Sequence, residues 1–332
     1  MIKVAVIGVG AIGRNHARVY SEMPEVKLVG VADIDRLAAE TTAARCGTAA
    51  YTDYEQMLDE CKPEAITLAL PTALHLSAAL AVIQRGIHLL IEKPIALHVE
   101  EGRQIIHAAR QAGVQLTIGH IERFNPAVTA LKMRLANNEL GRLFQIDARR
   151  QGSFPTRVHD VGVVVDLAVH DLDLIRYITG AEITRVYAET ERHIHATHED
   201  LLTGVVRLSS GVIGALTINW LTPTKIRELY VTGELGMFRV DYLTQDLYFF
   251  ENATAQSSEW ETMQVLRGVS EGCMIRYMIA KKEPLRAEQE AFLAAVRGEA
   301  APAVTGEDGL KALELAQAIV TSGQERRVVS LI

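Results

Sequence analysis

The segment Gly8-Val9-Gly10-Ala11-Ile12-Gly13 constrains the fold of this 332-residue chain more than any other. It follows an apolar, β-branched run over Ile2–Ile7 and opens a helical pattern that begins at Gly13. In this context the first glycine permits a tight turn, the second lets a phosphate approach the backbone, and the third lets helix and strand pack closely. The segment therefore predicts a strand–turn–helix unit that holds a pyrophosphate at the helix N-terminus. The alternative is a glycine-rich turn that binds nothing.

An acidic residue stands where a dinucleotide-binding unit needs one. Asp33 follows the second apolar run, Val26–Ala32, and lies 20 residues after Gly13. A carboxylate there accepts the ribose hydroxyls and repels a 2′-phosphate, which favours NAD over NADP. Arg36 has two interpretations, a partner for a 2′-phosphate or a solvated residue of the next helix. We therefore expect NAD as the cofactor, with a binding set that comprises Gly8, Gly10, Ala11, Ile12, Gly13, Asp33 and Arg36.

The first 120 residues alternate short apolar runs with helical patterns. The expected strands are Ile2–Ile7, Val26–Ala32, Ala65–Leu70, Ile87–Ile91 and Val114–Ile118, with a weaker one near Thr48–Tyr51. The expected helices are Gly13–Met23, Asp35–Cys46, Ala73–Arg85 and Leu97–Gln111. This alternation is typical of βαβ units, so residues 1–120 are predicted to form a doubly wound, parallel Rossmann sheet.

The pattern changes after residue 120. Two helices are expected over Pro126–Asn137 and Val163–Ile178, and two more close the chain over Ala287–Arg297 and Asp308–Ser322. The strands expected between them are Arg185–His195, Leu201–Leu208, Val212–Trp220, Arg227–Thr232, Met237–Tyr242 and Leu247–Glu251. Successive strands without intervening helices indicate a large, mainly antiparallel sheet. We therefore predict an α/β protein with a second, α+β domain over residues 121–332.

The composition excludes several classes of protein. Hydrophobic residues make up 48% and charged residues 23% of the chain, which is ordinary for a globular protein with large cores. The net charge of −7 argues against a general nucleic-acid binder. No apolar run reaches the roughly 18 residues of a membrane span, and three widely spaced cysteines suit a reducing compartment. We expect a cytoplasmic protein without membrane or nucleic-acid partners.

Two further strand ends carry candidate site residues, because ligands bind outside the carboxyl ends of strands in an open parallel sheet. The strand that begins at Ala65 leads to Pro71, Thr72 and His75, and the next leads to Glu92, Lys93 and Pro94. Because Lys93 precedes a proline, its backbone is expected to be extended, and the Lys93–Pro94 peptide bond is a candidate for the cis form. A partly desolvated lysine beside a positively charged nicotinamide gives up its proton more readily, which suits proton transfer from an alcohol. The alternative is an ordinary surface lysine.

The helix expected over Val163–Ile178 is apolar on nearly every side, yet Asp166, His170 and Asp173 fall on one stripe. A polar stripe on a buried helix suits the wall of a cavity, with the aspartates orienting His170 and raising its basicity. The alternatives are a stripe that faces bulk water and a histidine satisfied within the core.

Weaker candidates are the polar residues just past the sixth strand and the cations and histidines of the second half. Arg123 and Asn125 lie at a strand end, and Arg149, Arg150 and Arg157 form a local basic cluster that could hold a diphosphate. For at least one of the three, plain surface charge is the better interpretation. His193, His195 and His198 resemble metal ligands, but a solvated strand end is favoured and no metal is expected.

Together, the glycine motif, Glu92-Lys93-Pro94 and the Asp166-x-x-x-His170 helix resemble the glucose–fructose oxidoreductase/inositol dehydrogenase/MocA family over essentially the whole chain. The stretches Gly119–Pro126 and Asp160–Asp173 resemble the branch that oxidises the C3 hydroxyl of UDP-N-acetylglucosamine. The resemblance implies that Lys93 and His170 are the catalytic pair with Asp166 in support, and that Pro71, Thr72 and His75 contact the cofactor. The cofactor set then extends to Glu92 and Lys93, and the substrate set comprises Lys93, Arg123, Asn125, Arg157, Asp166 and His170. It also implies a homo-oligomer, a dimer or tetramer, that packs the open faces of its second sheets together.

The expected reaction is therefore an NAD-dependent oxidation of a sugar nucleotide to its 3-keto form, which a separate aminotransferase would use for amino-sugar glycoconjugates. Either Lys93 or His170 takes the hydroxyl proton while hydride passes to the nicotinamide. The alternatives are a dehydrogenase for another sugar, a uronic-acid nucleotide or an inositol, and a glycosidase that uses bound NAD transiently. A non-catalytic dinucleotide sensor of the same fold is the alternative from another class.

Overall fold

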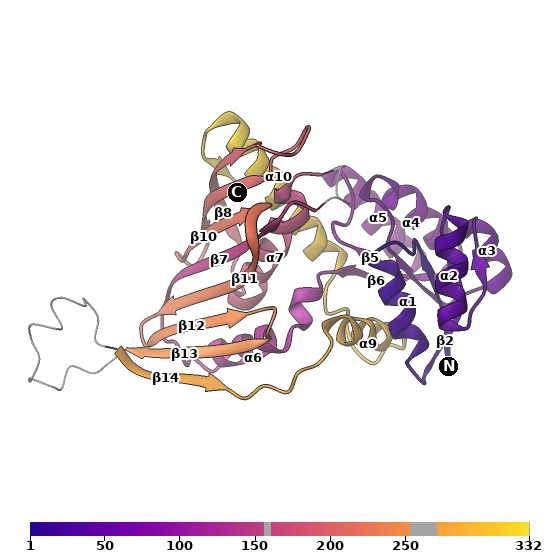
Figure 1. Ribbon diagram of the computed structural model, residues 1–332, viewed down its shortest axis with the longest axis horizontal. Coiled ribbons are helices and arrows are strands. Elements are labelled where there is room, and N and C mark those ends of the chain that lie inside the picture. The colour runs from indigo at the N-terminus through magenta and orange to yellow at the C-terminus, as the bar shows by residue number, and fades with distance from the viewer. Residues whose placement is uncertain (156–160, 253–270, 332) are drawn as a thin grey trace, which may run out of the picture. The chain divides into compact units, whose positions relative to one another are not determined.

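The computed structural model describes residues 1–155, 161–252 and 271–331. The chain divides into two compact units (Figure 1). The first unit comprises Met1–Ile121 and Glu283–Glu314, and the second comprises Glu122–Lys282 and Leu315–Ile332. No helix among the described residues is long and apolar enough to cross a membrane.

The first unit contains a six-stranded parallel sheet with the order β3-β2-β1-β4-β5-β6. Its strands are β1 (Ile2–Ile7), β2 (Val26–Ala32), β3 (Ala50–Tyr51), β4 (Ala65–Leu68), β5 (His88–Glu92) and β6 (Leu116–Gly119). This order is that of the doubly wound dinucleotide-binding fold, and it confirms the fold predicted from the alternating pattern. The strand order reverses between β1 and β4, so the crevice for a ligand is expected at their carboxyl ends.

Most of the helices that connect these strands begin and end close to the predicted residues. They are α1 (Gly13–Ser21), α2 (Arg36–Cys46), α3 (Tyr54–Cys61), η1 (Thr72–Leu74), α4 (His75–Gln84) and α5 (Val99–Ala112). The helix α3 was not predicted, because its eight residues give too short an apolar pattern to separate from a loop. Its boundaries follow local chemistry: the Asp53 carboxylate caps its first turn and Lys62 ends it with a positive φ.

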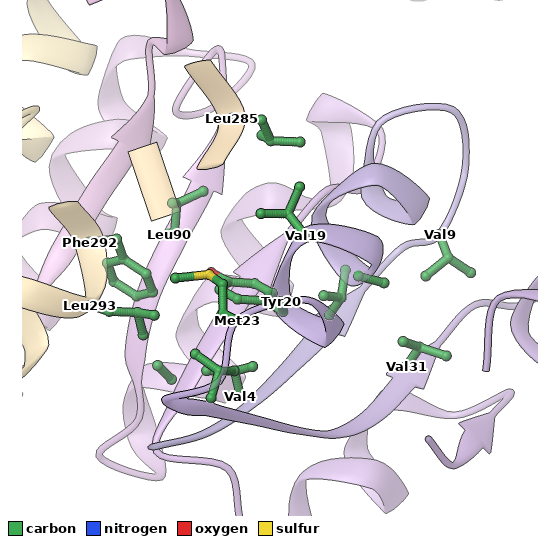
Figure 2. Packing of buried hydrophobic residues seen from close by; sticks show 14 of the residues in the cluster. Val4, Val9, Val19, Tyr20, Met23, Val31, Leu90, Leu285, Phe292 and Leu293 are labelled. Atoms are coloured by element: carbon green, nitrogen blue, oxygen red, sulfur yellow. The ribbon is translucent and has the colours of Figure 1, made fainter. Parts of the chain in front are cut away.

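Two helices near the end of the chain complete the first unit. They are α9 (Pro284–Val296) and the first part of α10 (Gly306–Glu325). Leu285, Phe292 and Leu293 of α9 are buried in the same cluster as Tyr20 and Leu90, and Figure 2 shows Phe292 and Leu293 directed toward this core.

The expected division at residue 120 therefore differs from the observed one for residues 283–314. Helix periodicity identifies the apolar face of a helix but not the sheet that the face covers, so the sequence placed these residues with the neighbouring part of the chain.

The second unit contains a nine-stranded sheet with the order β14-β13-β12-β11-β7-β10-β9-β8-β15. Its strands are β7 (Leu143–Ser153), β8 (Ile183–Glu191), β9 (Leu201–Leu208), β10 (Ile213–Asn219), β11 (Leu221–Gly233), β12 (Gly236–Asp241), β13 (Asp246–Asn252), β14 (Glu271–Tyr277) and β15 (Val329–Ser330). Only β7 and β10 pair in parallel among these neighbours, so the prediction of a large, mainly antiparallel sheet is confirmed.

The helical segments η2 (Ile121–Phe124), α6 (Pro126–Ala136), η3 (Val164–Ala168) and α7 (Val169–Thr179) accompany this sheet. The helix α6 packs against α7, β12 and β13 (Figure 1). The segment η3 packs against β10. The helix α7 ends at Thr179, and the following Gly180 has a φ of 64°, the left-handed conformation that commonly terminates a helix. The segment η3 is a π-helical turn, whereas the sequence predicted an unbroken α-helix from Val163.

Candidate functional site

The glycine turn between β1 and α1 has the conformation that a pyrophosphate site requires. Gly8 has a φ of +84°, and a Cβ on it would lie 2.5 Å from the Ala69 carbonyl oxygen. A Cβ on Gly13 would lie 1.8 Å from the Gly8 carbonyl oxygen, so α1 packs on the turn only because no side chain is present. A Cβ on Gly10 meets no atom within 4 Å. The backbone at Gly10 is therefore open for close approach by a ligand, which fits a dinucleotide phosphate.

The Asp33 carboxylate is fixed at the end of β2 beside this turn. Its Oδ2 accepts a hydrogen bond from the Val9 backbone N–H at 2.8 Å, and its Oδ1 accepts one from the Asp35 N–H at 2.9 Å. Ile12 immediately precedes α1. The structure thus brings the predicted glycine turn and the predicted acidic residue together, with one directly bonded to the other.

Arg36 is the first residue of α2 and its side chain is 75% exposed. Its Nη1 lies 3.8 Å from the Glu40 carboxylate on the next turn of the same helix, which is a weak surface pair. This placement agrees with a solvated helix residue, and contact with a cofactor stays a prediction.

The end of β4 carries one exposed and two buried candidates. Pro71 is exposed, Thr72 is buried at the start of η1, and His75 is 1% exposed. The His75 Nδ1 lies 2.9 Å from the Pro94 carbonyl oxygen and its Nε2 lies 3.0 Å from the Leu70 carbonyl oxygen. Burial lowers the pKa of His75, against the opposing effect of these carbonyls. The ring therefore ties together the loops that follow β4 and β5, and its contact with the cofactor stays a prediction.

Lys93 is half-buried directly after β5, and its bond to Pro94 is cis. The Glu92 side chain is 15% exposed, and its Oε2 accepts a hydrogen bond from the Lys93 N–H at 3.2 Å. Burial opposes ionisation of Glu92, but hydrogen bonding by His16 and the charges of His16 and Lys93 lower its pKa overall. An ionised carboxylate therefore lies next to the candidate proton-transfer residue.

A buried polar cluster that the sequence did not predict surrounds Glu92. The His16 Nε2 lies 2.9 Å from the Glu92 Oε1, and the Gln289 Nε2 lies 3.0 Å from the His16 Nδ1. Glu288 is fully buried, and neither of its carboxyl oxygens has a hydrogen-bond partner in the described part of the chain. The sequence signal that could have identified Glu288 is its helical spacing, since it lies between Leu285 and Phe292 on the apolar face of α9.

In the second unit, the predicted stripe lies across the π-helical turn. Asp166 is 7% exposed within η3, His170 is 9% exposed in α7, and Asp173 is 1% exposed one turn later. A π-helical turn changes which side chains align along a helix, and such turns are frequent at functional sites. The three side chains are buried, which excludes the alternative of a stripe facing bulk water.

Asp173 forms a buried ion pair with Arg123. The Arg123 Nε donates to the Asp173 Oδ2 at 2.7 Å and its Nη2 donates to the Asp173 Oδ1 at 2.5 Å. The Asn125 amide is also engaged, since its Nδ2 donates to the Tyr242 carbonyl and its Oδ1 accepts from the Ala127 N–H at the start of α6. Arg123 and Asn125 therefore hold the elements of the second unit together, and their contact with a substrate stays a prediction.

The expected basic cluster is largely neutralised. Arg150 is 3% exposed, and it bonds Asp171 through Nε at 2.7 Å and Glu122 through Nη1 at 2.9 Å. Burial alone would lower the pKa of Arg150, but the charges of Asp171 and Glu122 raise it. Arg149 pairs with Asp147 at the surface, at 2.8 Å. Arg157 lies outside the described residues.

The histidines of residues 193–198 do not form a solvated strand end, because β8 ends at Glu191. The Asp200 carboxylate is fully buried and accepts backbone N–H groups of His193, Ile194 and His195. His195 is 7% exposed, and its ring stacks on Trp220. Within the described residues this segment is a loop closed by one carboxylate, which the sequence-based interpretation missed.

The parallel sheet, the glycine turn and the fixed Asp33 define a dinucleotide-binding oxidoreductase with a second unit built on an antiparallel sheet. Residues 2–120 match the model of the oxidoreductase family with an NAD-binding Rossmann fold, and residues 128–239 match the GFO/IDH/MocA C-terminal domain. The chain therefore belongs to the GFO/IDH/MocA family of NAD-binding oxidoreductases.

Relatives with different named activities resemble the chain. It is 30% identical over 295 residues to a UDP-N-acetylglucosamine 3-dehydrogenase from Acidithiobacillus ferrooxidans, covering 89% of this chain and 88% of the relative. The solved structure of UDP-N-acetylglucosamine 3-dehydrogenase GnnA from that organism superposes with a TM-score of 0.84 at 28% identity, covering 98% of each chain. A myo-inositol 2-dehydrogenase from Thermotoga maritima is 26% identical over 345 residues, covering 99% of this chain and 98% of that one.

Proposed function

We propose that this protein oxidises the C3 hydroxyl of UDP-N-acetylglucosamine with NAD. The cofactor part is supported by the open backbone at Gly10 beside the fixed Asp33 carboxylate, which can accept ribose hydroxyls. The substrate part is supported by the similarity to UDP-N-acetylglucosamine 3-dehydrogenase, which extends over 89% of the chain. That similarity is the observation that carries the choice of sugar nucleotide.

In this proposal the chain positions the reactants and moves one proton. When bound, NAD supplies the hydride acceptor. The glycine turn and Asp33 hold the dinucleotide, and Pro71 and Thr72 border it from the end of β4. Lys93 and His170 both act on the reacting hydroxyl, and one of them removes its proton as the C3 carbon is oxidised. Asp166 supports His170.

The environment of Lys93 supports proton transfer at this residue. It is half-buried and follows Glu92, whose carboxylate accepts its backbone N–H. His75 contacts the Pro94 carbonyl and so holds the loop that carries Lys93. A proton-transfer group needs a fixed position as well as a suitable basicity, and these contacts provide the former.

The test is a panel of nucleotide sugars, free sugars and inositols, each supplied with NAD or NADP and followed by absorbance of the reduced cofactor. We expect NADH formation with UDP-N-acetylglucosamine. The Lys93→Met and His170→Asn variants should each turn over at least about 100-fold more slowly and still bind NAD. Lys27→Met and His107→Asn, which change exposed residues of the same types, are the matched controls. Turnover near that of the wild type in both site variants would contradict the mechanism.

An inositol dehydrogenase is the second candidate, because the Thermotoga maritima enzyme aligns with nearly the whole chain at 26% identity. Faster NADH formation with an inositol than with any nucleotide sugar would favour it.

We further propose that the protein assembles as a homo-oligomer through the open face of its second sheet. Tyr187, Val205 and Ile213 are exposed there at 38%, 49% and 42%.

A further inference from the structure

Arg227 is a half-buried cation that forms no ion pair with the residues that the structure describes. It lies on β11, where its Nη1 donates to the carbonyl oxygens of Gln151 at 2.6 Å and Ile226 at 2.8 Å. No carboxylate within the described ranges of the chain forms an ion pair with it. The buried Arg123 and Arg150, in contrast, each bond a buried aspartate. Arg227 therefore differs from Arg123 and Arg150, the two buried arginines among the described residues of this unit.

The position of Arg227 makes this lack of a partner more costly. Its direct neighbour across the sheet is Arg150 on β7, so the two side chains lie on the same face of the sheet. Like charges placed directly opposite each other destabilise a sheet. Asp171 and Glu122 could compensate both cations, but the bonds that they form go to Arg150 alone.

Four charged groups act on Arg227 from the surrounding elements. Burial, followed by repulsion from Arg150, lowers the pKa of Arg227 to about 10. Asp171, Glu122 and Asp166 oppose this effect from a distance. Asp166, one of the groups whose charge acts on Arg227, belongs to the helix stripe that carries the proposed substrate residues. A desolvated charge is expensive unless a partner compensates it, and such groups concentrate at functional sites.

We propose that Arg227 binds an anionic group of the substrate, and that the substrate is therefore a nucleotide sugar or a sugar acid and not a neutral polyol. Phosphate and carboxylate groups each present two oxygens that a guanidinium fork can bind in a bidentate manner. The inference rests on the proposed function, because it assigns a further residue to that substrate. It separates the two candidate functions, since an inositol has no charge for Arg227 to bind.

The β11 bulge beside Arg227 provides a matched control. The pairing of β11 with β7 jumps from Leu221 opposite Ser153 to Ile226 opposite Gln151, which leaves Thr222–Lys225 unpaired. Lys225 on this bulge is exposed, so it carries the same charge two residues away without being buried. An effect of general surface charge would appear at Lys225 as well as at Arg227.

The experiment measures calorimetric binding to the NADH-saturated protein, with uridine diphosphate and uridine as probes. Arg227→Met should weaken binding of uridine diphosphate about 10- to 100-fold, which corresponds to the loss of one charge-assisted hydrogen bond. The same variant should bind uridine as well as the wild type does. Arg227→Lys should restore part of the affinity, and Lys225→Met should have little effect. A second arm compares UDP-N-acetylglucosamine with its uronic acid. If Arg227→Met affects only the preference for the uronic acid, the bound group is the carboxylate.

The results that overturn the inference differ from those that overturn the proposed function. The anion site would be refuted if wild type, Arg227→Met and Arg227→Lys bind uridine diphosphate equally well and also bind the uronic acid equally well. This holds even if NADH forms normally. Equal losses for uridine and uridine diphosphate would also refute it, because they indicate a purely structural role. If binding depends on Arg227 but no nucleotide sugar yields NADH, the anion site stands and the dehydrogenase proposal fails.

Discussion

Replacing Glu288 with glutamine should make the protein progressively more stable than the wild type as the pH rises. Glu288 is fully buried in α9, and both of its carboxyl oxygens lack a hydrogen-bond partner among the described residues. Burial, followed by the charge of Glu92, raises the pKa of Glu288 well above its ordinary value. The folded protein therefore favours the neutral acid at this position.

The size of the effect follows from proton linkage. A glutamate in the unfolded chain loses its proton near pH 4.3, whereas Glu288 in the folded protein keeps it. Above that pH the folded state binds one more proton than the unfolded state, so the stability of the wild type falls by up to about 1.4 kcal/mol per pH unit. The loss ends where the pH passes the folded-state pKa. Between pH 5 and pH 7 the variant should gain up to about 3 kcal/mol relative to the wild type.

The measurement is urea unfolding at several pH values, with hydrogen exchange of the α9 amides as a readout specific for the first unit. Glu299→Gln, an exposed carboxylate just beyond the same helix, is the control and should show no such trend. The diagnostic quantity is how the stability difference between variant and wild type changes with pH. A buried glutamine amide also needs hydrogen-bond partners, but the cost of lacking them is the same at every pH. A difference between Glu288→Gln and wild type that is constant from pH 5 to pH 8 would refute the assignment of a neutral acid.

Two further predictions test the glycine turn and a buried ion pair. Gly10→Ala should fold normally but lose most of its affinity for NAD in a fluorescence titration, because the added methyl group lies in open space where the phosphate approaches. Gly13→Ala should instead lower the unfolding free energy by about 1–3 kcal/mol or more, because its Cβ would overlap the Gly8 carbonyl oxygen. Equal unfolding midpoints for Gly10→Ala and Gly13→Ala would contradict this prediction. Arg123→Met should cost about 3–5 kcal/mol in urea unfolding because it removes the guanidinium that pairs with the buried Asp173 carboxylate. The double variant with Asp173→Leu should recover part of this cost. A double variant no more stable than Arg123→Met would argue against charge burial as the cause.

The sequence predicted the first unit well because its signals are local. A glycine turn, its strand and its helix are contiguous, and Asp33 follows at a spacing that the fold requires. The strand order and the bond from Val9 to Asp33 then agree with the prediction. The boundaries of the predicted strands shift by only a few residues because β-branched runs define them.

Elements whose character depends on distant partners could not be predicted in the same way. The central strand β7 contains Asp147, Arg149 and Arg150, a charged run that does not look like a buried strand. Arg150 is buried only because Asp171 and Glu122, from other parts of the chain, neutralise it. The position of α9 and the loop closed by Asp200 depend likewise on contacts between segments far apart in the sequence.

The buried charges of this protein separate structural from functional groups by whether a partner is present. Arg123 with Asp173, and Arg150 with Asp171 and Glu122, are compensated within the second unit. Removing one member of such a pair should therefore damage stability. Arg227 has no such pair within the described part of the chain. Its removal should therefore relieve repulsion from Arg150, and the cost should appear in ligand binding instead. A set of charge-removal variants should thus divide into two groups, one that loses stability and one that loses affinity. Arg227→Met belongs in the second.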